Sequence, residues 1–239
     1  MSAACGTPVV VVDLGASGPS MPPAGQDTAG RVTGLPTVIV GVHPAGLDGP
    51  PASVAGLVDL VVPDPESVVA AVEASPQAAV TLALVLRASL SLPMPAALAA
   101  ESAAYSTLQA GPEFARWRAA RPDAPSGSGA GAGRMVVVQR GAAGMRVTLS
   151  RPQRHNAVSR AMRDQLVEAL LVACADPTIE RVVLDGTGPS FCSGGDLTEF
   201  GTLPDPATAH LVRLTRSPAR LLAELAPRLE VRLHGACIG

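Results

Sequence analysis

The sequence contains no lysine, because all 18 of its basic residues are arginine. This absence excludes Schiff-base chemistry on a lysine, a P-loop lysine and a lysine general base. Aromatic residues make up only 2% of the chain, so aromatic platforms that stack on nucleic-acid bases are not expected. No apolar run approaches the roughly 20 residues of a membrane-spanning helix. The net charge of −2 gives no field that favours nucleic acid or an anionic membrane, so neither is expected as a partner.

Cysteine and histidine are also scarce. The four cysteines show neither a CxxC motif nor regular spacing, and His155, His210 and His234 lack the spacing of metal ligands, so no metal site is expected. The N-terminus has no basic segment and is interrupted early by Pro and Gly, so no secretory signal is recognised. We therefore expect reduced thiols and a cytoplasmic protein.

The apolar runs of residues 1–120 predict an N-terminal α/β region that is rich in helices. Three strand-like runs are rich in β-branched residues and bounded by Gly or Pro. Asp64 is expected to cap a helix that has Pro65 at its first position. The expected strands lie at 9–14, 37–42 and 57–62, and the expected helices at 65–73, 77–88, 95–109 and 113–120.

Residues 121–134 are rich in Pro, Ser, Gly and Ala and have no apolar period, which predicts a flexible linker. A different organisation is expected over 135–239. The glycines around 141–144 favour a hairpin, and Ser159 is expected to cap a helix. The expected strands are 135–139, 145–149, 181–185 and 230–233. The helix capped by Ser159 is expected to end at about 175, and a second helix is expected over 207–225. This order indicates an α/β fold class.

Three short motifs each follow the end of a predicted strand. They are RPQRHNA at 151–157, FCSGGDL at 191–197 and HGACIG at 234–239. A Gly-Gly-Asp alone would carry almost no information, whereas three motifs in register are specific. Together they resemble the enoyl-CoA hydratase/isomerase (crotonase) superfamily. The resemblance covers 135–239, corresponds to the N-terminal half of a family member, and implies an incomplete crotonase-like core built of ββα turns.

The resemblance implies chemistry on acyl-CoA thioesters, namely hydration or double-bond isomerisation through an enolate. Two backbone N–H groups would stabilise the enolate oxygen, because fixed donors need no reorganisation. By resemblance, Gly195 supplies one donor, and the residue after Gly239 supplies the other. Arg154 either meets a CoA phosphate or is a solvated arginine. The resemblance implies the following substrate-binding residues: Arg154, Asn156, Ala157, Ser193, Gly194, Asp196, Leu197 and Gly239.

Other residues of these motifs are expected to be structural. Asp196 is expected to cap the turn after Gly195 rather than act as a base, and Cys192 and Cys237 are expected to be small packing residues. The glutamates of family hydratases would lie beyond position 239. Glu199 and Glu224 are therefore expected to be helix or surface carboxylates without an acid–base role.

Two functions remain open from the sequence. One is an acyl-CoA enzyme of the hydratase/isomerase type in fatty acid metabolism, and the other is a non-catalytic CoA-binding or assembly partner. The resemblance implies no bound cofactor other than the coenzyme A of the substrate. It also implies a homo-oligomer, either a trimer or a hexamer, or assembly with a partner chain. A weaker resemblance links residues 56–63 and 97–117 to the C-terminal half of the same family, and the alternative for this region is an unrelated α/β domain with helices.

Overall fold

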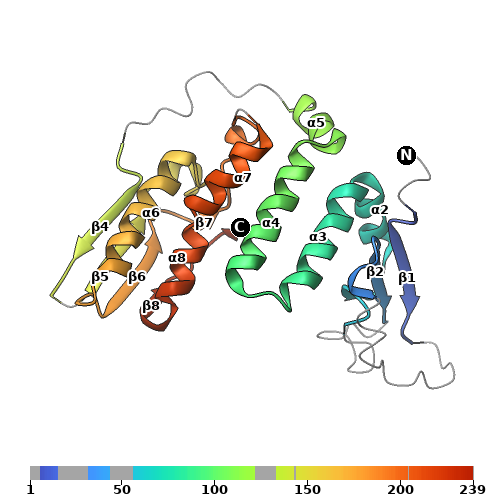
Figure 1. Ribbon diagram of the computed structural model, residues 1–239, viewed down its shortest axis with the longest axis horizontal. Coiled ribbons are helices and arrows are strands. Elements are labelled where there is room, and N and C mark those ends of the chain that lie inside the picture. The colour runs from blue at the N-terminus through green and yellow to red at the C-terminus, as the bar shows by residue number, and fades with distance from the viewer. Residues whose placement is uncertain are drawn as a thin grey trace. The chain divides into compact units, whose positions relative to one another are not determined.

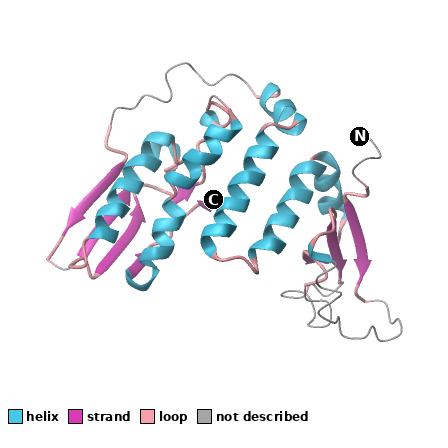
Figure 2. Ribbon diagram, viewed as in Figure 1, coloured by secondary structure: helices cyan, strands magenta, loops and turns pink. Residues whose placement is uncertain are grey.

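The computed structural model describes residues 6–15, 32–43, 56–121, 133–142, 144–203 and 205–238. Its contacts divide the chain into two compact units, Met1–Arg118 and Ala119–Gly239. The predicted linker lies for most of its length outside the described residues, and its assignment stays a prediction. Both units combine strands and helices, as Figure 2 shows, so the α/β class is confirmed.

The first unit contains a parallel sheet in the order β1-β2-β3. Figure 1 shows β1 and β2 of this sheet. The middle strand is buried over Val38–Val40, and Val72 and Ala83 from two helices pack in the same core. Burial on both faces is typical of a parallel strand covered by helices. Its elements are β1 (Val9–Asp13), β2 (Val38–Val42), β3 (Leu60–Val62), α2 (Glu66–Ala74), α3 (Pro76–Ser89), α4 (Met94–Gln109) and α5 (Pro112–Ala119).

Arg87 on α3 joins this helix to the sheet side of the first unit. Its guanidinium binds both carboxylate oxygens of Asp59, with distances of 2.8 and 2.6 Å, and donates to the carbonyl oxygens of Val32, Leu35 and Thr37. Asp59 in turn accepts from the Ile39 amide at 2.7 Å. One arginine therefore ties α3 to the segments that precede β2 and β3.

The second unit is built on a four-stranded sheet in the order β4-β5-β6-β8. The hairpin between β4 and β5 is confirmed, and the other pairings are parallel. Along β5, Met145, Val147 and Leu149 are buried, and the residues between them lie on the other face. Its main elements are β4 (Val136–Arg140), β5 (Gly144–Leu149), α6 (Arg160–Ala175), β6 (Arg181–Gly186) and β8 (Leu229–Val231).

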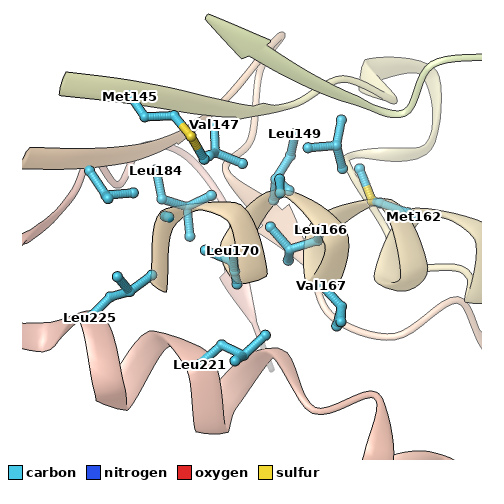
Figure 3. Packing of buried hydrophobic residues seen from close by; sticks show 14 of the residues in the cluster. Met145, Val147, Leu149, Met162, Leu166, Val167, Leu170, Leu184, Leu221 and Leu225 are labelled. Carbon is cyan, nitrogen blue, oxygen red and sulfur yellow. The ribbon is translucent and has the colours of Figure 1, made fainter. Parts of the chain in front are cut away.

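Helix α6 packs on the buried face of this sheet. As predicted, Ser159 caps it, because the Ser159 hydroxyl accepts from the Met162 amide at 3.2 Å. Figure 3 shows Leu166 and Leu170 of α6 between the strand side chains and Leu221 and Leu225. This layer forms the core of the unit.

The helix predicted over 207–225 is wrong as a single element. The structure has two helices, α7 (Pro206–Thr215) and α8 (Pro218–Leu225). Pro218 has no N–H to continue α7, and the Ser217 hydroxyl caps α8 by accepting from the Arg220 amide at 3.2 Å. The predicted strand 230–233 is also shorter, because only Leu229–Val231 pairs with β6.

The remaining elements are short and surround the predicted motifs. The strands β7 (Cys192–Ser193) and β9 (Cys237–Ile238) form a separate parallel pair. Single 3-10 turns cover η2 (Pro152–Arg154), η3 (Leu197–Glu199) and η4 (Ala226–Arg228). In the described part of the chain, no single helix is long and apolar enough to cross a membrane; α2 and α3 meet the criterion only together, and they bend by 107° at their junction.

Candidate functional site

Backbone hydrogen bonds bring the three motifs together. Cys192 and Cys237 are register partners across β7 and β9, and the Phe191 amide donates to the His234 carbonyl at 2.8 Å. The Ser193 amide donates to the His155 carbonyl at 3.0 Å. Segments that lie about 40 residues apart in sequence therefore meet at one place in the second unit.

The Gly195 peptide is held from both sides. The Val158 amide donates to the Gly194 carbonyl at 2.8 Å, and the Asp196 amide donates to the Val158 carbonyl at 3.0 Å. In a parallel bridge of this kind, the N–H of the central residue points away from its partner strand. The Gly195 N–H accordingly has no acceptor among the described residues, and Gly195 is exposed.

Neighbouring groups would crowd a side chain at either of the two glycines. A β-carbon at Gly195 would lie 2.9 Å from Cε1 of Phe200. Gly194 has a φ of +87°, which side chains rarely adopt, and a β-carbon there would lie 3.2 Å from the Ile238 carbonyl oxygen. Gly194 therefore lies against the backbone of β9, and Gly195 lies against the ring of Phe200.

Asn156 is completely buried and organises the loops around the site. Its Oδ1 accepts from the Arg151 amide at 2.8 Å, and its Nδ2 lies 2.9, 2.8 and 3.1 Å from the carbonyl oxygens of Thr187, Ser190 and Phe191. Asn156 also has a φ of +53°, a conformation that Asn tolerates better than most residues. Its side chain is thus engaged within the protein, and its backbone amide and carbonyl are bonded to Arg151 and Cys192, so Asn156 supports the loops from inside the fold.

A buried ion pair joins Arg151 and Asp196, and no pattern in the sequence predicts this role for Arg151. Their Nη1 and Oδ2 atoms lie 2.7 Å apart, and each side chain is 6% exposed. Asp196 also accepts from the Thr198 amide and hydroxyl at 3.1 and 2.7 Å, which confirms its capping role. Burial opposes ionisation, but the hydrogen bonds from Thr198 and Arg151 lower the pKa of Asp196 below its usual value.

The other predicted binding residues surround this core. Arg154 and Leu197 are exposed, and the Arg154 guanidinium has no partner within the described ranges. Ala157 and Ser193 are half-buried. Gly239 lies outside the described residues.

The structure also places the two glutamates and two cysteines for which a structural role was expected. The Glu199 carboxylate accepts from the Arg160 amide at 2.6 Å and so caps α6, and Glu224 faces Arg220 on the same helix. Cys192 is buried in the core, as predicted. The same prediction is wrong for Cys237, which is exposed.

Two open grooves lie outside the candidate site. One, of about 540 Å³, is lined by residues of β4, β5 and α6, and the other, of about 380 Å³, is lined by residues of α2 and α3. Within the described residues, no group of three His, Cys, Asp or Glu side chains could hold a metal ion.

Comparison with known proteins finds relatives of a part of the second unit. The family model described as enoyl-CoA hydratase/isomerase matches residues 139–217. The Mycobacterium tuberculosis protein named "Probable enoyl-CoA hydratase echA14" is 42% identical over 69 residues, which are 28% of this chain and 27% of that protein. The 1,2-epoxyphenylacetyl-CoA isomerase of Escherichia coli is 34% identical over 99 residues, 40% of this chain and 38% of the isomerase.

A solved structure of an enoyl-CoA hydratase from Rhodobacter sphaeroides is 31% identical, with a TM-score of 0.36 over 42% of this chain and 32% of that one. The chain thus spans only about a quarter to two fifths of the length of these relatives. The weaker resemblance of residues 56–63 and 97–117 stays a prediction. Residues 139–217 are therefore similar to the enoyl-CoA hydratase/isomerase family of the crotonase superfamily.

Proposed function

We propose that residues 135–239 bind an acyl-CoA thioester and stabilise its enolate with the Gly195 N–H. The observation that carries this proposal is the Gly195 peptide, which is fixed on both sides by Val158 while its own donor is unused among the described residues. The match of residues 139–217 to the family model supports the choice of ligand, because the relatives named above carry the names of enzymes that act on CoA thioesters.

The chemistry follows from where charge develops. Loss of a proton next to a thioester carbonyl places negative charge on the carbonyl oxygen. A backbone N–H that is already oriented stabilises this oxygen without paying for reorganisation. In this proposal Arg154 supplies an exposed cation for a CoA phosphate, a group that the planar guanidinium can bind through two parallel hydrogen bonds.

A second function, binding without turnover, is favoured by the state of the nearby carboxylates. Asp196 is paired with Arg151, and Glu199 caps α6. In this proposal, neither of these two carboxylates, which follow Gly195 closely in the sequence, is available as an acid or base. Both functions share the same binding site and differ only in proton transfer.

Calorimetry and a hydration assay on the 239-residue chain test the proposal. We expect acetoacetyl-CoA, whose enolate mimics the intermediate, to bind more tightly than free CoA, and crotonyl-CoA hydration to stay near background. Hydration well above background would establish the enzyme and would show that an acid or base has been overlooked. Equal affinity for acetoacetyl-CoA and CoA would refute enolate stabilisation at this site.

A further inference from the structure

We infer that Arg151 is a positioning residue that holds the Gly195 N–H in line with the thioester oxygen. This inference rests on the proposed function of the site. It assigns the binding preference for an enolate to a side chain that does not itself contact the ligand.

A single nitrogen of Arg151 bridges the two backbone segments that flank the Gly195 peptide. Nη1 donates to the Ala157 carbonyl at 2.9 Å and to Asp196 Oδ2 at 2.7 Å. Ala157 immediately precedes Val158, and Asp196 immediately follows Gly195. The guanidinium thus fixes the segments on either side of the bridge that orients the donor.

Arg151 is itself held firmly in place. Its amide donates to Asn156 Oδ1 at 2.8 Å, and its carbonyl accepts from the amides of Arg154 and Asn156, both at 3.0 Å. Side chain and backbone are therefore both tied to the loop that carries the first motif. Any displacement of the donor peptide would have to stretch a charge-assisted hydrogen bond, which is a stronger restraint than a neutral one.

Stability alone is a weak explanation for this pair. Replacing a buried ion pair by apolar side chains of similar size is often neutral or stabilising. A buried pair can instead fix geometry, and the geometry of an oxyanion donor matters greatly. A hydrogen bond weakens steeply once its donor angle falls below about 120°, and a misplacement of about 1 Å can cost on the order of 100-fold in rate.

The test compares how well each variant discriminates acetoacetyl-CoA from free CoA in calorimetric titrations of the full chain. Asp196→Asn removes one charge of the pair. The double variant Arg151→Met/Asp196→Asn removes both charges, leaves no unpaired buried charge, and keeps an oxygen for Thr198. Asp185→Asn is the matched control, because Asp185 also accepts from an arginine, Arg146 at 2.5 Å, and from a threonine hydroxyl, Thr148 at 2.6 Å.

In both Asp196 variants we expect the preference for acetoacetyl-CoA over CoA to fall about tenfold or more, the scale of a misaligned oxyanion donor. CoA affinity itself should change little, because CoA lacks the carbonyl that the donor meets. Asp185→Asn should keep the preference of the wild type. Circular dichroism confirms that each variant is folded.

An unchanged preference in a folded Asp196 variant, with a clear preference in the wild type, would overturn the positioning role and leave the proposed function standing. An equal loss in Asp185→Asn would also overturn it, because the effect would then be one of general stability. Absence of any preference in the wild type would overturn the proposed function and this inference with it.

Discussion

Asn156 and Arg151 hold the backbone of the candidate site from inside the fold. Both are buried, and their polar atoms bind backbone groups of the loops at 151–158 and 187–196. Gly195 contributes the opposite property, an exposed peptide whose N–H is unused within the described residues. The site therefore combines buried side chains that fix geometry with a backbone donor that faces outward.

We predict that Asn156→Ala strongly destabilises the second unit. The change leaves the amide of Arg151 and the carbonyls of Ser190 and Phe191 without their partner, and it places alanine at a φ of +53°. Several unsatisfied buried groups should cost about 3 kcal/mol or more in free energy of unfolding. Hydrogen exchange of peptides from α6, measured by mass spectrometry, reports the opening of this unit.

His155→Ala is the matched control for this prediction. His155 has a φ of +49° but is exposed, and its Nδ1 has a single side-chain contact, Ser190 Oγ at 2.9 Å. The His155→Ala variant should lose only the stability that a positive φ costs alanine, because the buried hydrogen bonds of Asn156 remain. Equal destabilisation by the two substitutions would contradict the role given to the Asn156 amide.

Acidification should destabilise the second unit through its lowered carboxylate pKa values. A hydrogen bond from Thr178 lowers the pKa of Asp176 to about 2, and one from Arg181 lowers the pKa of Glu230 to about 2. The pKa of Asp196 is also lowered. Each of these carboxyl groups has a lower pKa in the folded state than in the unfolded state. Their contribution to the free energy of unfolding is therefore fully present above about pH 4.5 and is lost as the pH falls toward 2. Urea midpoints followed by circular dichroism from pH 2 to 7 check this sign.

Asp196→Asn should flatten that pH profile, because an amide does not titrate. Its urea midpoint should be lower than that of the wild type at pH 7, and the two should converge at the acid end. A wild-type midpoint that rises on acidification, or an Asn variant with the wild-type slope, would contradict the assignment of Asp196 as a buried, ionised partner of Arg151.

At the level of helices and strands, features that depend on neighbouring residues were predictable. The hairpin around 141–144 and the Ser159 cap are confirmed, because turn glycines and capping hydroxyls act within a few positions. The break at Pro218 was also a local signal, but the apolar pattern of 207–225 concealed it. The proline lies at the first turn of α8, where it is favourable, rather than inside a helix.

The candidate site was predictable only in part, for a different physical reason. The motif glycines were found because their spacing matches a family pattern. The partner of Arg151 lies 45 positions away, and those of Asn156 lie 31 to 35 positions away, so no local pattern reveals them. Asn156 was consequently expected at the ligand, whereas its side chain supports the loops.

Helix α3 offers a test of element docking in the first unit. Arg87→Lys keeps the charge, but lysine has three donors on a single nitrogen and cannot reproduce the fork that meets Asp59 and three carbonyls. We expect a loss of about 2–3 kcal/mol in free energy of unfolding. Trp117, the single tryptophan, lies in α5 and reports this unit by fluorescence. Arg116→Lys, at an exposed position, should leave the free energy of unfolding unchanged. An equal loss in the two variants would contradict the role given to the Arg87 guanidinium.

Across the whole chain, exposed apolar side chains predict self-association. Leu82, Leu86 and Leu90 recur every four residues along α3 and at its C-terminal end, and they are 58%, 57% and 88% exposed. Such a contiguous stripe is typical of an interface. Sedimentation should give a mass above the 24.0 kDa of the monomer, and Leu86→Glu/Leu90→Glu should lower it. Leu211→Glu, at a similarly exposed leucine in α7, is the control. A wild type that stays monomeric at tens of micromolar would contradict this.

The most direct test of the central claim removes the Gly195 N–H without changing any side chain that the site uses. Gly195→Pro deletes the donor, and Gly195→Ala keeps it while adding the same β-carbon against Phe200. Loss of an oxyanion donor costs about 3–4 kcal/mol in transition-state stabilisation. We therefore expect acetoacetyl-CoA to bind at least about tenfold more weakly to the proline variant than to the alanine variant, with CoA affinity equal in both. Equal affinity of the two variants for acetoacetyl-CoA would contradict the account.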